Sequence, residues 1–255
     1  MLKKKFYLLI FCLLSTIQVS KAEVIKFEQG GASDATGIVP HGKLQIESTA
    51  FSYINVNKKS GNLFETGETL LRYGLIENRL EARTRIFGLS FRDGQVCIDS
   101  MSLGAKVGLL QEQHLMPNAD IIVDFLIPLD KDFYSHSFTH SYKLTMDKSL
   151  TNKLSAVTNL TLVFTERREE SSNNFTDTQI PYVFGLEYDL TEKLSFSEEF
   201  YGTWAMSGHL GNSLGLASCL SYAFKDNLVG TATVLLGLND NTDPISTNMG
   251  LVYRF

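Results

Sequence analysis

In residues 248–255, at the end of the chain, every second side chain is apolar or aromatic: Met249, Leu251, Tyr253 and Phe255. Side chains on a β-strand point alternately to its two faces, so this stretch predicts a strand with one apolar and one more polar face. The terminal residue continues the apolar face. Whatever the rest of the chain forms has to place that face in an apolar environment.

The first 22 residues have the composition of a secretory signal peptide. Lysines at positions 3–5 precede the apolar run 6–14, and the small-residue exit Ser20-Lys21-Ala22 follows. We expect cleavage after Ala22. The apolar run is too short for a membrane-spanning helix, and the residues before Cys12 do not resemble a lipoprotein cleavage site. The sequence therefore predicts an exported chain with neither a helical nor a lipid anchor.

Alternating segments follow one another from Lys43 to the end of the chain, and we predict twelve strands. They cover residues 43–55, 66–76, 79–90, 101–111, 119–127, 136–147, 153–165, 178–190, 193–204, 212–224, 227–238 and 246–255. Residues 23–40 are polar and glycine-bearing without periodicity, and we expect a periplasmic lead-in there, either outside the barrel or folded into its mouth, before a barrel domain over 41–255. Twelve is an even number, as single-chain bacterial barrels require when both termini are periplasmic.

The links between these segments are alternately short and long. In each of four short links, a few polar residues turn the chain and a leucine opens the next strand: Leu80, Leu154, Leu194 and Leu228. The other links, such as 166–178, are longer and more polar. This asymmetry predicts an all-β, transmembrane, antiparallel up-and-down β-barrel of about 12 strands in the outer membrane of a Gram-negative bacterium. A soluble β-sandwich is the alternative, but it does not require short links at one end.

Aromatic residues gather beside the short links. They are Tyr73, Tyr188, Tyr222, Tyr253 and Phe255, whereas Trp204 falls toward the other rim. This distribution is typical of an aromatic girdle at a membrane interface. The aromatic residues of a sandwich core would have no reason to gather there. The ending on Phe255 also resembles the terminal signal of outer-membrane barrels, so we expect the barrel-assembly machinery to be a partner.

The composition agrees with strands that have one apolar and one polar face. The mean hydropathy is −0.02, as expected when half of the strand residues face polar surroundings. The net charge of −5 argues against a nucleic-acid partner. Cys97 is expected in a loop and Cys219 in a strand, which favours two unpaired thiols over a disulfide.

Motifs in the first half resemble the meta-pathway phenol-degradation family. They are Val39-Pro40-His41-Gly42-Lys43-Leu44-Gln45-Ile46-Glu47-Ser48, Glu68 to Leu75 followed by Asn78 to Arg83, Ser102 to Leu110, Pro117 and Leu126-Ile127-Pro128. The resemblance covers nearly all of the mature chain and implies an outer-membrane barrel that transports small organic compounds, without fixing a substrate. The chain departs from the family at Leu129-Asp130-Lys131, where a glycine is usual.

If the apolar positions face lipid, their neighbours line the interior. The predicted pore-lining residues are Lys43, Gln45, Glu47, Glu68, Arg72, Glu81, Arg83, Arg85, Lys106, Asp120, Asp124, Lys143, Glu187, Glu199 and Arg254. Buried charges must be paired or hydrated, and a lumen offers both. One interpretation is a basic sector facing an acidic one across the lumen, able to orient an ionised solute. The other is that Glu47, Glu68 and Glu81 neutralise the arginines as internal struts.

Two features test these expectations. Glu198 lies in alternation with Phe196 and Phe200 and would point to lipid, unless the strand bulges there or the residue lies near the outer rim. Residues 135–141 contain serines and histidines, but His140 and Ser141 are adjacent in a strand and point to opposite faces, so no nucleophile and base are brought together.

We therefore expect a passive channel for small organic solutes, with aromatic and anionic solutes as candidates, and not an enzyme. The alternatives are an outer-membrane hydrolase acting on lipid or ester, and a structural barrel whose lumen is plugged. No cofactor or metal is predicted, because the histidines at 41, 114, 136, 140 and 209 are scattered and nucleotide-binding motifs are missing. The expected partners are outer-membrane lipid, the assembly machinery and a small organic solute.

Overall fold

The computed structural model describes residues 25–28, 31–55, 62–92, 95–98, 100–129, 138–168, 174–207 and 211–255. The predicted signal peptide lies outside these residues. No helix in the described part of the chain is long and apolar enough to cross a membrane.

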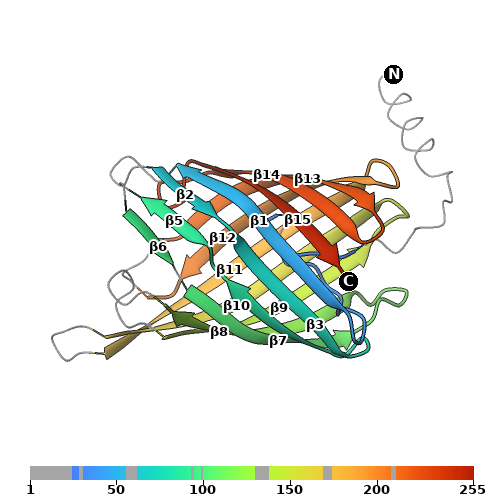
Figure 1. Cartoon of the computed structure of the whole chain (residues 1–255), viewed down its shortest axis with the longest axis horizontal. Coiled ribbons are helices and arrows are strands. Elements are labelled where there is room, and N and C mark those ends of the chain that lie inside the picture. The colour runs from blue at the N-terminus through green and yellow to red at the C-terminus, as the bar shows by residue number, and fades with distance from the viewer. Residues whose placement is uncertain are drawn as a thin grey trace, which may run out of the picture.

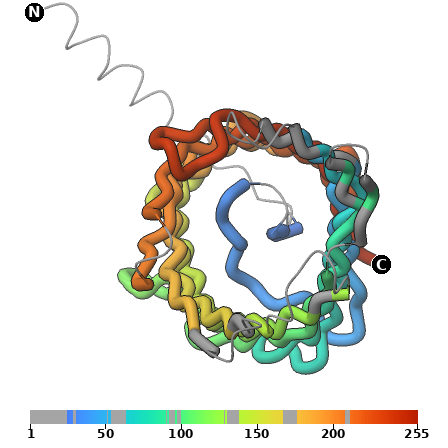
Figure 2. Tube along the Cα trace, turned by 90° about the vertical axis from the view of Figure 1, so that its left-hand side faces the viewer, coloured from blue at the N-terminus to red at the C-terminus, as the bar shows by residue number. Residues whose placement is uncertain are grey.

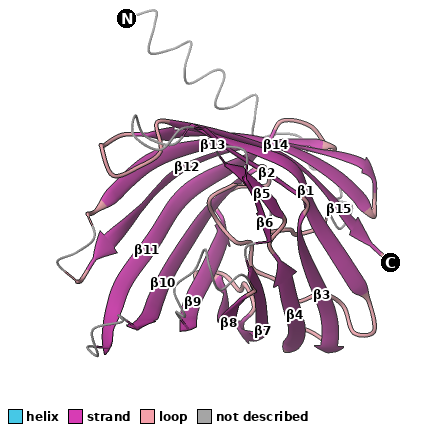
Figure 3. Ribbon diagram, turned by 60° about the vertical axis from the view of Figure 1, so that its left-hand side comes forward, coloured by secondary structure: helices cyan, strands magenta, loops and turns pink. Residues whose placement is uncertain are grey.

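The described residues form a closed antiparallel barrel of tilted strands (Figures 1 and 3). The strands are β1 (Leu44–Asn55), β2 (Asn62–Thr66), β3 (Glu68–Ile76), β4 (Leu80–Ile86), β5 (Leu89–Arg92), β6 (Gln95–Ile98), β7 (Ser100–Leu110), β8 (Asn118–Pro128), β9 (Phe138–Ser149), β10 (Leu154–Arg168), β11 (Asn174–Asp189), β12 (Leu194–Ala205), β13 (Ser213–Lys225), β14 (Leu228–Gly237) and β15 (Ile245–Arg254). Strand β1 pairs with β15 and closes the ring, which removes the open sheet edges.

Three of the wall strands are interrupted, so fifteen segments make twelve strands. β2 continues into β3, β4 into β5 and β6 into β7, and pairing runs through the breaks in one register: Thr69 faces Ile86, and Thr66 faces Leu89. Gly67 has φ of 79°, a conformation that favours glycine. At Gly88 a Cβ would lie 1.8 Å from the Thr66 carbonyl oxygen. The prediction of a twelve-stranded barrel is confirmed, although Cys97 lies in β6 and not in a loop.

The short links lie together at one end, here called the short-turn end. Two of them share one hydrogen-bond pattern: the hydroxyl of Thr151 accepts from the backbone N–H groups of Lys153 and Leu154 at 3.2 and 3.0 Å. The hydroxyl of Thr191 accepts equivalent bonds at the same distances. A threonine that satisfies two backbone donors explains why the same short sequence pattern serves both turns.

The outer surface is apolar and carries the expected aromatic residues. Tyr73, Tyr222, Tyr253 and Phe255 are 37–57 % exposed beside the short-turn end, and Trp204 is 48 % exposed toward the other end. Large exposed apolar side chains also cover the strands between them, such as Leu103 on β7 and Leu220 on β13. An apolar band between aromatic girdles is the outer surface that a lipid bilayer requires.

Glu198 interrupts this apolar surface. β12 pairs with β11 and β13 through it without a bulge, and the side chain is exposed on the outer face. Its Oε2 accepts a hydrogen bond of 2.6 Å from the hydroxyl of Ser218. The carboxylate therefore faces the surface predicted to contact lipid, about midway along its strand.

Replacing Glu198 by glutamine is expected to stabilise the barrel in lipid by about 1 kcal/mol, because an acidic group on the lipid face costs free energy that a neutral amide largely avoids. Urea unfolding of the protein in phospholipid vesicles measures the change. Ser218→Ala is the matched control: it removes the hydrogen-bond partner, keeps the charge and should lower the stability. A Glu198→Gln variant less stable than the parent would show that this face is covered by something other than lipid.

Candidate functional site

A stretch from before the first strand lies inside the barrel. Residues 25–28 and 31–40, here called the inner segment, run within the ring of strands (Figure 2). Ile25 packs on Val229 and Val252, the inward-facing residues of β14 and β15. Val39, at the other end of the segment, is 1 % exposed. The lead-in is therefore folded into the lumen, where it contacts both sides of the wall.

Three wall cations converge on one carboxylate of the inner segment, Glu28. The guanidinium Nη2 of Arg83 lies 2.7 Å from Glu28 Oε2, and Lys106 Nζ lies 3.0 Å from Oε1. Arg72 Nη2 approaches Oε1 to 3.6 Å. All four side chains are at most 2 % exposed. Because isolated buried charges are costly, these contacts hold the segment against β3, β4 and β7.

Wall carboxylates complete this cluster. Arg72 bonds Glu81 through Nε at 2.8 Å and Glu47 through Nη1 at 3.0 Å. The same two carboxylates accept backbone hydrogen bonds from the inner segment: Glu28 N–H bonds Glu47 at 2.7 Å, and Val39 N–H bonds Glu81 at 2.9 Å. The wall thus neutralises its own cations and binds the backbone of the segment.

The opposite wall holds the segment mainly through neutral donors. The backbone N–H of Ser33 donates to Glu199 Oε2 at 3.1 Å, and the Ser33 hydroxyl donates to Oε1 at 2.5 Å. A Cβ at Gly31 would lie 2.5 Å from the same carboxylate, so a larger residue there would displace the Glu199 side chain. Asn159 accepts from the Asp34 N–H at 2.7 Å and donates to its carbonyl oxygen at 3.0 Å.

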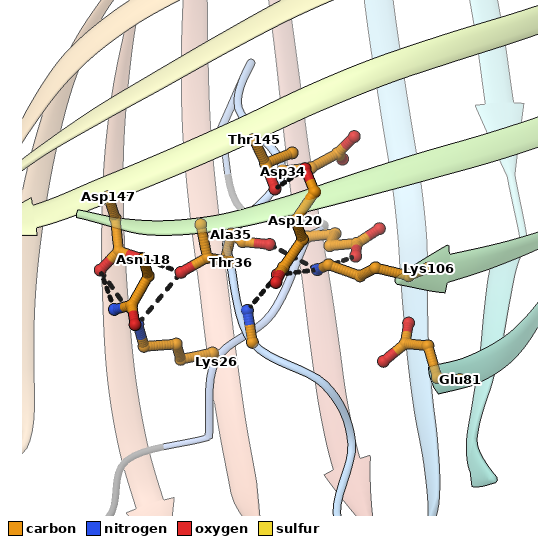
Figure 4. Close-up of polar contacts among 12 residues, drawn as sticks. Lys26, Asp34, Ala35, Thr36, Glu81, Lys106, Asn118, Asp120, Thr145 and Asp147 are labelled. Atoms are coloured by element: carbon orange, nitrogen blue, oxygen red, sulfur yellow. Dashed lines mark hydrogen bonds and ion pairs between the residues drawn. The ribbon is translucent and has the colours of Figure 1, made fainter. Parts of the chain in front are cut away.

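The middle of the segment is tied to β7, β8 and β9 (Figure 4). Lys106 donates to the carbonyl oxygen of Ala35 at 2.6 Å and lies 3.8 Å from Asp120 Oδ2. Asp120 also accepts from the backbone N–H of Gly37 at 2.6 Å. On β9, Asp147 pairs with Lys26 at 3.0 Å. These bonds hold the segment against this side of the wall.

The structure brings most of the predicted lumen residues together. Arg83 lies 3.3 Å from Asp124, Arg85 lies 3.5 Å from Glu68, and Arg254 donates to Gln45 at 2.9 Å. Lys143 pairs with Asp34 of the inner segment. Lys43 directly precedes β1, and its side chain is exposed. Glu47, Glu68 and Glu81 pair with arginines of the wall, which is the arrangement that the interpretation as internal struts expects.

Sequence reasoning missed Glu28 and Asp34, which bind the wall cations from within. Both carboxylates lie in a polar stretch without periodicity, so no pattern assigned them a face. The available signal was the unusual number of cations predicted on one sector of the wall, because buried cations need anionic partners.

A cavity of about 480 Å³ remains between the inner segment and the wall of β9 to β13. Its lining includes Ser155, Glu187, Asp189, Ser195, Ser197, Glu199, Cys219 and Ser221 from the wall, and Lys26 and Ser33 from the segment. Glu112 in the link between β7 and β8 also lines it. A hydrogen bond from Lys148 and further bonds from Ser149 hold the pKa of Glu112 below its usual value, so this carboxylate is ionised at neutral pH. Because this cavity remains, the inner segment narrows the lumen without filling it on this side.

Of the residues considered for catalysis, the described His140 and Ser141 lie on opposite faces of β9. His140 stacks on Phe164 at 5.2 Å between ring centroids and belongs to the outer face, whereas Ser141 pairs across the strands with the inward-facing Asp124. The other serines and histidine of that stretch, at 135–137, lie outside the described residues. Among the residues that the structure describes, no three His, Cys, Asp or Glu side chains are grouped to hold a metal ion.

A closed ring with an apolar outside and a charged inside is a β-barrel of the outer-membrane class. A family model described as "Putative MetA-pathway of phenol degradation" matches residues 27–255, and the chain belongs to this family. No match is found among curated proteins.

Solved structures share the fold. An outer membrane channel from Pseudomonas putida F1 is 14 % identical with a TM-score of 0.66, over 86 % of this chain and 97 % of that one. The NanC porin is 11 % identical with a TM-score of 0.56, over 82 % and 98 %. The KdgM porin is 11 % identical with a TM-score of 0.51, over 84 % and 98 %.

Proposed function

We propose that the protein is a passive, non-enzymatic channel for small organic solutes in the outer membrane of a Gram-negative bacterium. The observation that carries this proposal is the cavity beside the inner segment: a barrel that served only as a scaffold could fill its lumen completely. The family and the outer-membrane channels of the same fold support it.

The barrel offers no source of energy among its described residues, so solutes would cross down their own gradients. A solute entering the lumen loses part of its hydration, and hydroxyl and carboxylate groups of the wall replace the lost contacts. Phe255, 57 % exposed beside the closing strand pair, would serve as the terminal signal for the barrel-assembly machinery.

A second candidate, a structural barrel with a plugged lumen, is favoured by the position of the inner segment. Reconstitution of the full mature chain in a planar bilayer separates the two. A channel gives discrete current steps at constant voltage, whereas a plugged barrel inserts without them. A heat-denatured sample is the control for leakage. Silence from a sample whose gel mobility shows a folded barrel would refute passive passage by the intact chain.

A further inference from the structure

The cavity beside the inner segment has an apolar side and a side that carries hydroxyl groups. On the apolar side, Ile25 and Phe27 of the segment line the cavity and pack together. On the other side, the wall contributes serines from β10, β12 and β13: Ser155, Ser195, Ser197 and Ser221. A solute in this cavity therefore contacts hydrocarbon on one side and hydroxyl groups on the other.

The wall hydroxyls lie close to one another. Ser195 on β12 pairs in register with Ser221 on β13, and Ser197 follows two residues later on the same face of β12. Neighbouring strands are about 4.8 Å apart, and alternate residues of one strand are about 7 Å apart. One compact molecule can therefore reach several of these hydroxyls at once.

Three of the serines have unused hydrogen-bonding capacity. In the part of the chain that the structure describes, the side chains of Ser155, Ser195 and Ser221 make no hydrogen bond to another residue. Ser221 is only 9 % exposed, yet it lines the cavity. A buried hydroxyl without a partner costs free energy, and it can both donate and accept. These serines point to a ligand that carries hydroxyl groups of its own.

The charged groups of the cavity, in contrast, already have partners. They are the ion pairs Lys26–Asp147 at 3.0 Å and Glu112–Lys148 at 2.8 Å, Glu199, which accepts hydrogen bonds from Ser33, and Glu187 and Asp189, which also have interactions within the protein. An ion that enters loses part of its hydration, and these groups have already spent their charge on other partners.

Two wall cations remain partly exposed, but neither lines the cavity. The side chains of Arg85 and Lys143 are 24 % and 25 % exposed, and they pair with Glu68 and Asp34. The exposed positive charge of the lumen is thus paired and separate from the serines. The groups that a solute meets inside the cavity are mainly hydroxyl and apolar.

We infer that the cavity selects small uncharged solutes that carry several hydroxyl groups, in preference to ions of similar size. The inference rests on the proposed function and specifies its substrate class. The hydroxyl groups of such a solute bond the wall serines, and its carbon–hydrogen surface contacts Ile25 and Phe27. The sequence-based expectation of anionic solutes differs, because it treated the arginines as open to the lumen.

Uptake into vesicles that contain the full mature chain tests this selectivity. Sorbitol, gluconate and N-methylglucamine are polyols of similar size that are uncharged, anionic and cationic. In one potassium chloride buffer, with valinomycin to hold the membrane potential at zero, labelled sorbitol should enter several-fold faster than either ion. Uptake of gluconate or N-methylglucamine as fast as that of sorbitol would overturn the inference.

The double variant Ser195→Ala/Ser221→Ala should slow sorbitol uptake several-fold and change the uptake of the two ions little, because it removes two paired hydroxyls without adding charge. Ser213→Ala is the matched control, since it removes a hydroxyl from β13 outside the cavity lining. Gel mobility before and after heating confirms that each variant is folded. An unchanged rate of sorbitol uptake in the folded double variant would refute the role of the serines.

Cys219 gives a second readout that needs no transport, because it lines the cavity and pairs in register with Ser197. In a Cys97→Ser background, its thiol loses a proton to water, attacks the sulfur of an alkyl methanethiosulfonate, forms a mixed disulfide and releases methanesulfinate. The uncharged hydroxyethyl reagent should react several-fold faster than the trimethylammonium and sulfonate reagents, after correction for their rates with a free thiol. Excess sorbitol should slow the reaction, and the double variant should lose this protection.

The two measurements distinguish the failures. A barrel that takes up no solute but keeps the order of the thiol reactions and the protection by sorbitol would refute passive passage and leave the preference of the cavity standing. A barrel that conducts ions but shows neither faster sorbitol uptake nor faster reaction of the uncharged reagent would refute the preference and leave the channel standing.

Discussion

Replacing Glu28 by glutamine is expected to release the inner segment from the wall while the barrel stays closed. Glu28 is the carboxylate on which Arg72, Arg83 and Lys106 converge, and all four side chains are almost fully buried. Removing one partner of a buried ion pair typically costs about 3–5 kcal/mol, because it leaves the other charge uncompensated. The barrel can avoid this cost by moving the segment out and hydrating the cations.

The other contacts are weaker anchors, and each of the two further ion pairs, Lys143–Asp34 and Lys26–Asp147, joins a single cation to a single carboxylate. The apolar contact of the segment is small, since Ile25 and Phe27 pack against Val229, Val252 and Ala223. Net contributions of single hydrogen bonds are about 0.5–1.5 kcal/mol. The charge cluster is thus the largest single term holding the segment, and its loss should shift the equilibrium toward the released state.

Trypsin cleavage after Lys26 reports the release, because the protease is too large to enter the lumen and cleaves the segment only outside it. Peptide mass spectrometry should show cleavage at least tenfold faster in Glu28→Gln than in the parent, a ratio equivalent to about 1.4 kcal/mol. Glu77→Gln is the control: Glu77 accepts from the backbone N–H of His41 at 2.8 Å, but in an exposed position. Equal cleavage rates in all three proteins would show that Glu28 does not hold the segment.

The wall of the barrel could be predicted from sequence because its information is local. Alternation assigned Arg72, Glu81 and Lys106 to the inner face, and all three are buried in the lumen. The same rule placed Glu198 outside, where it lies. Lys43 directly precedes β1, one residue outside the predicted strand, because alternation does not define where the first strand begins.

What lies opposite each lumen residue could not be predicted. Alternation gives the face of a side chain but not its partner across the barrel, and the partner of Lys143 is Asp34, more than a hundred residues earlier. Glu28 reaches three strands at once through a segment with no periodic pattern. The choice between a transverse field and internal struts therefore depended on contacts that only the folded chain defines.

Deleting residues 23–39, with the signal sequence kept, is expected to raise the single-channel conductance several-fold. The deletion removes the segment that crosses the lumen, and the freed volume fills with water. The charges that remain on the wall stay compensated, because water in the lumen hydrates them and Arg72 stays paired with Glu47 and Glu81. The pairings that close the wall are made between the strands themselves, so we expect the barrel still to fold, as gel mobility before and after heating will show.

The deletion should also change selectivity, and this result separates an opened pore from a damaged barrel. With Glu28 and Asp34 gone, Arg83, Lys106 and Lys143 face the lumen without their inner partners, so the permeability ratio of potassium to chloride should be lower than in the parent. Nonspecific leakage would raise the current without this shift. A folded deletion variant with the conductance and reversal potential of the parent would mean that the inner segment does not narrow the path, and that ions cross where the segment makes no contact.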